Sequence, residues 1–230
     1  MTPRFLPAAG VSLFVAALCA APFALSTYGV DVLDSVGLYA LLALSLNLVL
    51  GEAGLYDMGH AAFFAVGAYT TAILTTRLGL PLLATLPAAA LAAGLFAALV
   101  ALPVLRLRGD YLLIVTVGLG EIVRIALVND VGGWTGGANG IFGIPRPVLF
   151  GTKLKTPEQL FWLIWGAVGL TVLVFRRLSA SRFGRQLRAL AEDEVAAEGS
   201  GVDTARARLT AFVLGSAWAG MAGTLFAAKM

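Results

Sequence analysis

The stretch YLLIVTVGLGEIVRIALV, residues 111–128, decides the class of fold. It is almost wholly apolar and approaches the ~20 residues that an α-helix needs to cross a bilayer. Glu121 and Arg124 interrupt it. Charged side chains inside a membrane span are costly and usually face the interior of a helix bundle. The stretch therefore predicts a membrane helix whose two charged side chains pair inside the bundle, away from lipid.

The composition of the whole chain has the same character. Of its 230 residues, 59% are hydrophobic and 13% are charged, whereas a soluble domain carries about 25% charged residues. The arginines flank apolar runs, which argues against a nucleic-acid-binding domain. Cys19 is the single cysteine, so no intrachain disulfide is possible. One histidine and one cysteine do not make a conventional zinc site.

Seven apolar runs follow one another along the chain. They predict an all-α integral membrane protein, a polytopic helical bundle of about seven membrane segments in a single domain, residues 1–230. The first run also fits a cleaved signal peptide, but its length and the spans that follow favour a membrane segment. The runs are residues 5–28, 33–50, 59–76, 82–105, 111–128, 159–175 and 209–230.

The distribution of arginine predicts the orientation. With the N-terminus inside, most of the sixteen Lys and Arg residues lie on the cytoplasmic side, as in other multi-pass proteins. Residues 130–158, which are rich in Gly and Pro, then form an extracytoplasmic loop. Residues 176–208 form a cytoplasmic loop.

Polar residues gather where the second run meets the third, in NLVLGEAGLYDMGHAAFFAVGAY (residues 47–69). Asn47, Glu52, Asp57 and His60 lie here, beside several glycines. The segment is either a tight cytoplasmic turn or a broken helix at membrane depth. A broken helix is tolerated only where its backbone is buried in protein or lines a cavity.

Glu121 and Arg124 are three residues apart, so they share one helical face and can pair. The pair is either structural, orienting the helix, or part of the polar wall of a translocation path. Together with the four polar residues of the 47–69 stretch, these two are the candidates for such a path.

The cytoplasmic segment contains a second candidate site. Residues 186–198 favour a helix, with Leu187, Leu190, Ala191 and Val195 close to one face. Gly199 and Gly201 then stop it. The segment is either a solvated loop or a short amphipathic helix that docks into a groove of a soluble partner.

Signatures of catalysis are missing from the sequence. There is no G-x-x-x-x-G-K-[ST] motif, so the chain does not bind ATP through a P-loop. With a single histidine, no Ser-His-Asp or Cys-His set is credible. We expect no enzyme activity, no cofactor and no metal in this chain.

Several long motifs resemble the LivM-type permease of branched-chain amino acid ABC transporters. They are PVLRLRGDYLLIVTVGLGEIVRI (103–125), TGGANGIFGIPRP (135–147), FGRQLRALAEDEVAAEGSGV (183–202) and LTAFVLGSAWAGMAGTLFAA (209–228). The 47–69 stretch resembles the second and third helices of that family, and related permeases for urea and short amides share the pattern.

The resemblance implies a pore subunit in a bacterial plasma (inner) membrane. Its partners would be a LivH-type permease, two cytoplasmic ATP-binding subunits that use the ATP, and a periplasmic or extracellular amino-acid-binding protein. Glu194, Ala196, Ala197 and Gly201 are similar to the family's Glu-x-Ala-Ala coupling motif, and Arg188 would add charge to the same ATPase contact.

One departure from the family is the end of the chain. Family members continue past AGTLFAA with further membrane helices, so this chain is expected to be a C-terminally shortened member. Independent transport is then in doubt. A non-transporting membrane subunit, or a secondary transporter that uses Glu121 for proton coupling, are the other interpretations.

Overall fold

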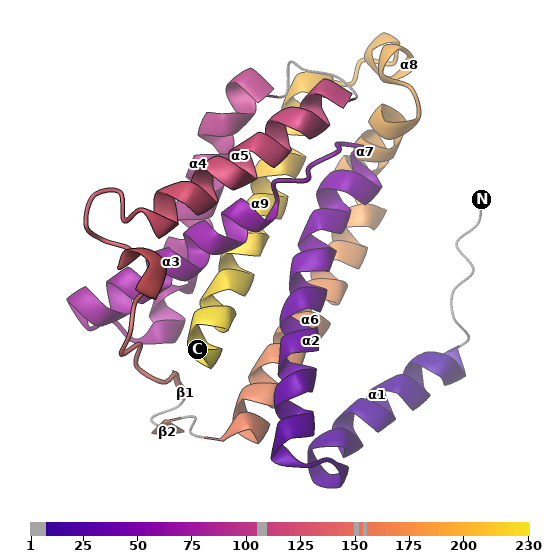
Figure 1. Ribbon diagram of the computed structural model, residues 1–230. Coiled ribbons are helices and arrows are strands. Elements are labelled where there is room, and N and C mark those ends of the chain that lie inside the picture. Colours follow the sequence, from indigo (N-terminus) through magenta and orange to yellow (C-terminus); the bar gives the residue numbers. More distant parts are fainter. Residues whose placement is uncertain (1–7, 105–109, 150–151, 154–155) are drawn as a thin grey trace.

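The computed structural model describes residues 8–104, 110–149, 152–153 and 156–230. Apart from one hairpin of two-residue strands, the regular elements of this part of the chain are helices, as the sequence predicts (Figure 1). In chain order they are α1 (Ala8–Ala24), α2 (Thr27–Leu46), η1 (Asn47–Glu52), α3 (Ala61–Leu78), η2 (Leu82–Thr85), α4 (Leu86–Val104), α5 (Asp110–Val128), η3 (Gly137–Asn139), β1 (Val148–Leu149), β2 (Thr152–Lys153), α6 (Pro157–Ala180), α7 (Arg182–Glu192), α8 (Glu194–Gly199) and α9 (Thr204–Lys229).

Among the described residues, six helical segments are long and apolar enough to cross a membrane. They confirm the second to the seventh predicted runs, and the chain is a polytopic membrane protein. The first run forms α1, a shorter helix of 17 residues that lies at an angle outside the bundle (Figure 1). The six segments are Thr27–Glu52, Ala61–Leu78, Leu82–Val104, Tyr111–Val128, Pro157–Ala180 and Thr204–Lys229.

Helix α9 is the centre of the bundle, with contacts to α2, α3 and α4. Small residues allow this close packing, as is common between membrane helices. A Cβ added at Gly67 of α3 would lie 2.2 Å from the carbonyl oxygen of Gly220 in α9. Phe63 and Phe212 fill the adjacent core edge to face, with ring centroids 5.4 Å apart.

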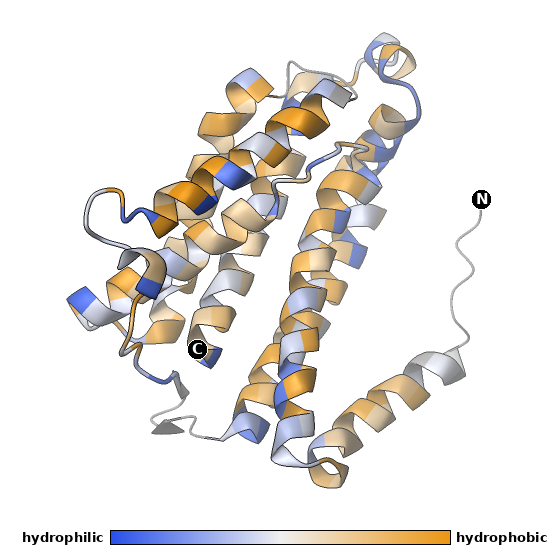
Figure 2. Ribbon diagram, viewed as in Figure 1, coloured by the Kyte–Doolittle hydropathy of each residue, from blue (hydrophilic) through white to orange (hydrophobic). Residues whose placement is uncertain are grey.

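Several of the connections lie at the two ends of the bundle. Helices α7 and α8 lie at one end with η1, and the β1–β2 hairpin lies at the other (Figure 1). Figure 2 shows hydrophilic residues concentrated around α7 and α8 and in the connecting loops, while the long helices are mostly hydrophobic. The β1–β2 hairpin, within the predicted loop of residues 130–158, and the α7–α8 segment therefore lie at opposite ends.

The structure of the segment between α6 and α9 differs in two respects from the one predicted for residues 176–208. Helix α6 continues to Ala180 and α9 begins at Thr204, so the connection is shorter than residues 176–208. The single helix predicted over 186–198 is wrong, because the chain leaves helical geometry at Asp193 (φ −155°, ψ 110°). The Asp193 carboxylate accepts hydrogen bonds from the backbone N–H groups of Val195 and Ala196 and starts α8 as a separate helix.

Candidate functional site

Residues 53–60 form a non-helical connection that packs inside the bundle. The Met58 N–H donates to Thr116 Oγ1 (3.1 Å), and a Cβ at Gly59 would lie 2.2 Å from the Thr116 carbonyl oxygen. Thr116 is well inside the span Tyr111–Val128. The segment is therefore no tight turn at the end of the bundle, but irregular backbone at the depth of a span, buried in protein as such backbone must be.

A buried chain of hydrogen bonds holds this segment to α2. His60 Nδ1 lies 2.9 Å from Asp57 Oδ2, and His60 Nε2 lies 2.9 Å from Ser45 Oγ. All three side chains are buried. The contact between Ser45 and His60 was not foreseen from the sequence, because the two residues are fifteen positions apart in the chain.

The arrangement of protons in this chain is constrained. The Ser45 hydroxyl has one proton and also lies 2.7 Å from the Leu42 carbonyl oxygen. A carboxylate only accepts hydrogen bonds, so Asp57 accepts from Nδ1–H of the imidazole, and the Ser45 hydroxyl lies at Nε2. Ser45 has no exposed surface, so the network is suited to holding backbone in place rather than to attacking a substrate.

The other two residues of the 47–69 group line a cavity of about 810 Å³ between α2, η1, α6 and α7. Asn47 and Glu52 contribute to one side, and Arg176 and Arg188 to the other. Its remaining lining is largely apolar, from Leu44, Leu48, Val172 and Phe175. The structure thus separates the predicted path residues, because Asp57 and His60 lie in the core while Asn47 and Glu52 face this cavity.

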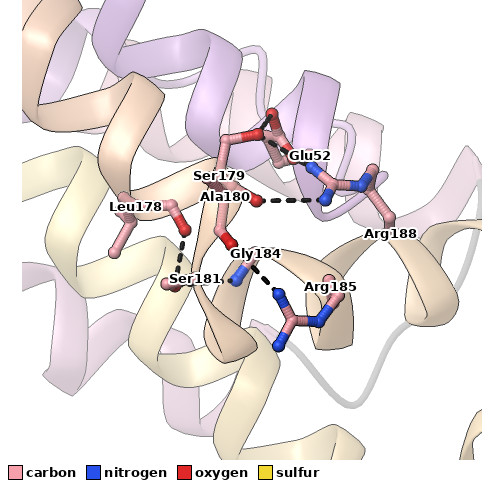
Figure 3. Close-up of polar contacts among 8 residues, drawn as sticks. All are labelled: Glu52, Leu178, Ser179, Ala180, Ser181, Gly184, Arg185 and Arg188. Carbon is pink, nitrogen blue, oxygen red and sulfur yellow. Dashed lines mark hydrogen bonds and ion pairs between the residues drawn. The ribbon is translucent and has the colours of Figure 1, made fainter. Parts of the chain in front are cut away.

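Three side chains of this cavity, the Glu52 cluster (Glu52, Ser179 and Arg188), connect α2 to α7. Glu52 accepts from Ser179 Oγ (2.7 Å) and from Arg188 Nη1 (2.9 Å). Arg188 also donates to the Ser179 carbonyl oxygen (3.0 Å). Figure 3 shows these side chains converging from η1, α6 and α7. One residue from each predicted group, Glu52 and Arg188, therefore meet in a single ion pair.

The joint between α6 and α7 is fixed beside this cluster. Ser181 caps α7 by accepting from the Gly184 N–H (3.3 Å), and Arg185 Nη1 donates to the Ala180 carbonyl oxygen (3.0 Å) (Figure 3). Helix α7 is thus held in a defined position against the ends of α2 and α6.

Glu121 and Arg124 form the predicted ion pair, with Nη2 of Arg124 2.6 Å from Oε1 of Glu121 and Nε 2.9 Å from Oε2. Their predicted position inside the bundle is wrong for this chain alone. Their side chains are 52% and 64% exposed, because α5 lies at the edge of the bundle and presents this face outward. The pair therefore faces away from the core of this chain.

The predicted coupling residues do not form one exposed patch. Ala197 is 3% exposed and packs inward, whereas Val195 is 75% exposed, and Ala196 beside it is also exposed. Glu194 pairs with Arg208 at the start of α9 (2.6 Å). Gly201 has φ +84° and turns the chain towards α9, as expected of a glycine at this point.

The loop after α5 is ordered by an aspartate that sequence reasoning missed. Asp130 Oδ1 accepts from the Thr135 N–H (2.7 Å), the Thr135 hydroxyl (3.0 Å) and the Gly136 N–H (3.1 Å). These bonds, the Thr135 N–H first, lower the pKa of Asp130 below its usual value. Arg77 at the end of α3 lies over the Trp134 ring at 4.7 Å and joins the loop to the bundle.

Comparisons with known proteins identify one matching family and several relatives. The family described as "Branched-chain amino acid transport system / permease component" matches residues 28–230. The chain is 43% identical to the high-affinity branched-chain amino acid transport system permease protein LivM of Escherichia coli (strain K12), over 95% of this chain and 56% of that protein. It is 42% identical to LivM of Salmonella typhimurium, over 90% and 54% respectively.

A more distant relative is the permease protein LivH of Escherichia coli (strain K12), which is 27% identical over 81% of this chain and 65% of that protein. No solved structure matches the chain. The chain spans little more than half the length of the two LivM proteins.

Proposed function

Because this chain belongs to the family of branched-chain amino acid transport permease components, we propose that it is a membrane-spanning permease subunit of an ABC importer. It forms part of the translocation path for branched-chain amino acids. Its partners are a LivH-type permease, two cytoplasmic ATP-binding subunits and an amino-acid-binding protein on the outer side. It carries out no chemistry of its own, since ATP is hydrolysed by the separate subunits.

The Glu52 cluster is the observation that supports this function best. An importer has to transmit movement from its ATPase to its membrane spans. Arg188 of α7 contacts Glu52 at the end of the α2 span and Ser179 at the end of the α6 span. A force applied to α7 or α8 therefore reaches two spans through direct polar contacts.

The orientation follows from the same proposal. Helices α7 and α8 face the cytoplasm, where the ATP-binding subunits are, and the loop between α5 and α6 faces outward. The N-terminus is cytoplasmic, in a bacterial plasma (inner) membrane, in agreement with the distribution of arginine.

The test is uptake by the assembled importer in proteoliposomes, with radiolabelled leucine, urea and acetamide as separate substrates. We expect ATP-dependent leucine uptake, lost in Arg188→Gln while the ATP-binding subunits still co-purify. Arg182→Gln, an exposed arginine on the same helix, is the matched control and should transport normally. Uptake of urea or acetamide in place of leucine would contradict the substrate, and normal uptake by Arg188→Gln would contradict the role of the Glu52 cluster.

A further inference from the structure

A buried carboxylate near the outer end of α2 has no hydrogen-bond partner. Asp34 is 0% exposed, and within the part of the chain that the structure describes, neither of its oxygens accepts a hydrogen bond. Burying an unpaired charge is costly, so such a group in a native fold calls for an explanation.

The nearby lysine does not satisfy Asp34, because its three donors are already used. Lys229 Nζ donates to the Asp31 carbonyl oxygen (2.6 Å) and to Ser35 Oγ (2.5 Å), and it lies 3.2 Å from Asp31 Oδ1. An ammonium group has three N–H donors. Within the described residues, Asp34 therefore remains an acceptor without a donor, because the ammonium group of Lys229 has no N–H left for it.

Asp34 lines a small cavity of about 130 Å³ between α2, the start of α6 and the end of α9. Asp31, Arg146 and Lys229 line it as well, and Glu158 is close enough to act on Asp34 electrostatically. The surroundings of the cavity therefore contain three acidic residues and two basic ones. The cavity exceeds the ~30 Å³ of one water molecule, so it has room for a cationic head group next to the unpaired carboxylate.

We propose that this cavity binds the α-ammonium group of an amino acid, with Asp34 as the acceptor and Arg146 as the counter-charge for the α-carboxylate. An ammonium group supplies the donors that both Asp34 oxygens lack, and charge-assisted hydrogen bonds of this kind are strong. The cavity takes the head group, and the aliphatic side chain stays outside it. The identity of the amino acid as the transported substrate rests on the proposed function.

The position of the cavity gives the site a role in uptake. Asp34 is seven residues into α2, roughly 10 Å along the helix from its start. It lies at the end of the bundle opposite α7 and α8, which is the outer end in the proposed orientation. An amino acid that arrives from the outer side meets this site within the first turns of the α2 span.

The test uses the purified 230-residue chain in lipid nanodiscs and equilibrium dialysis with radiolabelled leucine. Two analogues serve as competitors: 3-methylbutylamine, which keeps the amine, and 4-methylpentanoate, which keeps the carboxylate. We expect the amine to displace leucine and the acid to displace it poorly. Asp34→Asn should weaken leucine binding about tenfold or more, since it removes the charged acceptor. Glu192→Gln, on an exposed carboxylate at the end of α7 and far from this cavity, should leave it unchanged.

Several outcomes would overturn the site. Unchanged binding by Asp34→Asn would do so, as would equal displacement by the acid and the amine. Displacement by Na⁺ as effective as that by the amine would make it a simple cation site. If Asp34→Asn fails to fold, the competition on the unmodified chain still decides. Leucine uptake by the assembled importer is measured separately. Normal uptake by Asp34→Asn would contradict this site and leave the proposed function intact. Absence of uptake by the unmodified importer would contradict the proposed function but not the binding of the amine.

Discussion

Single residues hold the broken segment between α2 and α3 in place. A non-helical backbone inside a helix bundle keeps its position only if specific side chains hold it, because it lacks the regular hydrogen bonds of a helix. Asp57, His60 and Ser45 link the segment to α2 through side-chain hydrogen bonds, and Asp57 also accepts from the Gly59 N–H (3.0 Å).

Ser45→Ala should lower the free energy of unfolding by about 1–3 kcal/mol, because it removes the partner of a buried imidazole nitrogen. Thermal unfolding in detergent measures the loss. Thr76→Ala is the control, since the Thr76 hydroxyl bonds only to the Ala72 carbonyl of its own helix (2.7 Å). Equal losses in the two variants would show that the network adds nothing beyond a local hydroxyl contact.

The pair of Glu121 and Arg124 behaves as a unit in a membrane. Either single change, Glu121→Gln or Arg124→Gln, leaves one charge unpaired in the middle of an apolar span, which is less favourable than having none. We expect the double variant to give more folded protein in lipid than either single variant. Yields that fall additively would show that the two side chains are independent.

At the scale of whole elements, α7 and α8 present a surface different from the one that a single helix would give. The break at Asp193 turns α8 so that Ala197 packs inward, while Val195 and Ala196 remain exposed. A bulky residue at position 197 would disturb this chain itself, so the test of docking belongs at position 196.

Ala196→Trp should abolish co-purification with the ATP-binding subunits, because an added indole holds the two surfaces apart. The chain itself should fold and insert normally, since this side chain is exposed. Ala24→Trp, an exposed alanine at the end of α1, is the matched control. Co-purification of the Ala196 variant at the unmodified level would show that α8 is not the contact.

The sequence predicts elements better than the contacts between them. The apolar runs predicted the six spans, and the spacing of Glu121 and Arg124 predicted their ion pair. Both features depend on the local periodicity of the sequence. The Glu52 cluster joins residues 136 positions apart, and no local pattern connects them. The exposure of the Glu121–Arg124 pair was missed for a similar reason: periodicity places two residues on one face but does not say what that face meets. The break at Asp193 was missed because Leu, Arg and Ala before it and Ala and Glu after it favour helix, although an aspartate is a good N-cap.

At the scale of the whole molecule, stability depends on how closely α9 approaches its neighbours. Gly223 of α9 is as tightly placed as Gly67, since a Cβ there would lie 2.2 Å from the Phe64 carbonyl oxygen. The contact atoms are backbone, so they cannot move aside as a flexible side chain could.

Gly67→Ala should lower the free energy of unfolding by about 1–3 kcal/mol through overpacking. Gly166→Ala, in α6, is the control, because a Cβ there meets nothing within 4 Å; it should be neutral or slightly stabilising. Thermal unfolding of both variants in the same detergent compares them. A Gly67 variant as stable as the Gly166 variant would mean that the α3–α9 contact can relax.

The central position of α9 in the bundle also affects the order in which the helices pack during biosynthesis. Of the described helices, α9 is the last to leave the ribosome, yet α3 and α4 pack against it more extensively than against each other. Until α9 emerges, the face of α3 that contains Gly67 has no packing partner. Helices α3 and α4 then lack the larger part of their packing contacts. The helices described here therefore pack together only once α9 has emerged, rather than one helix at a time.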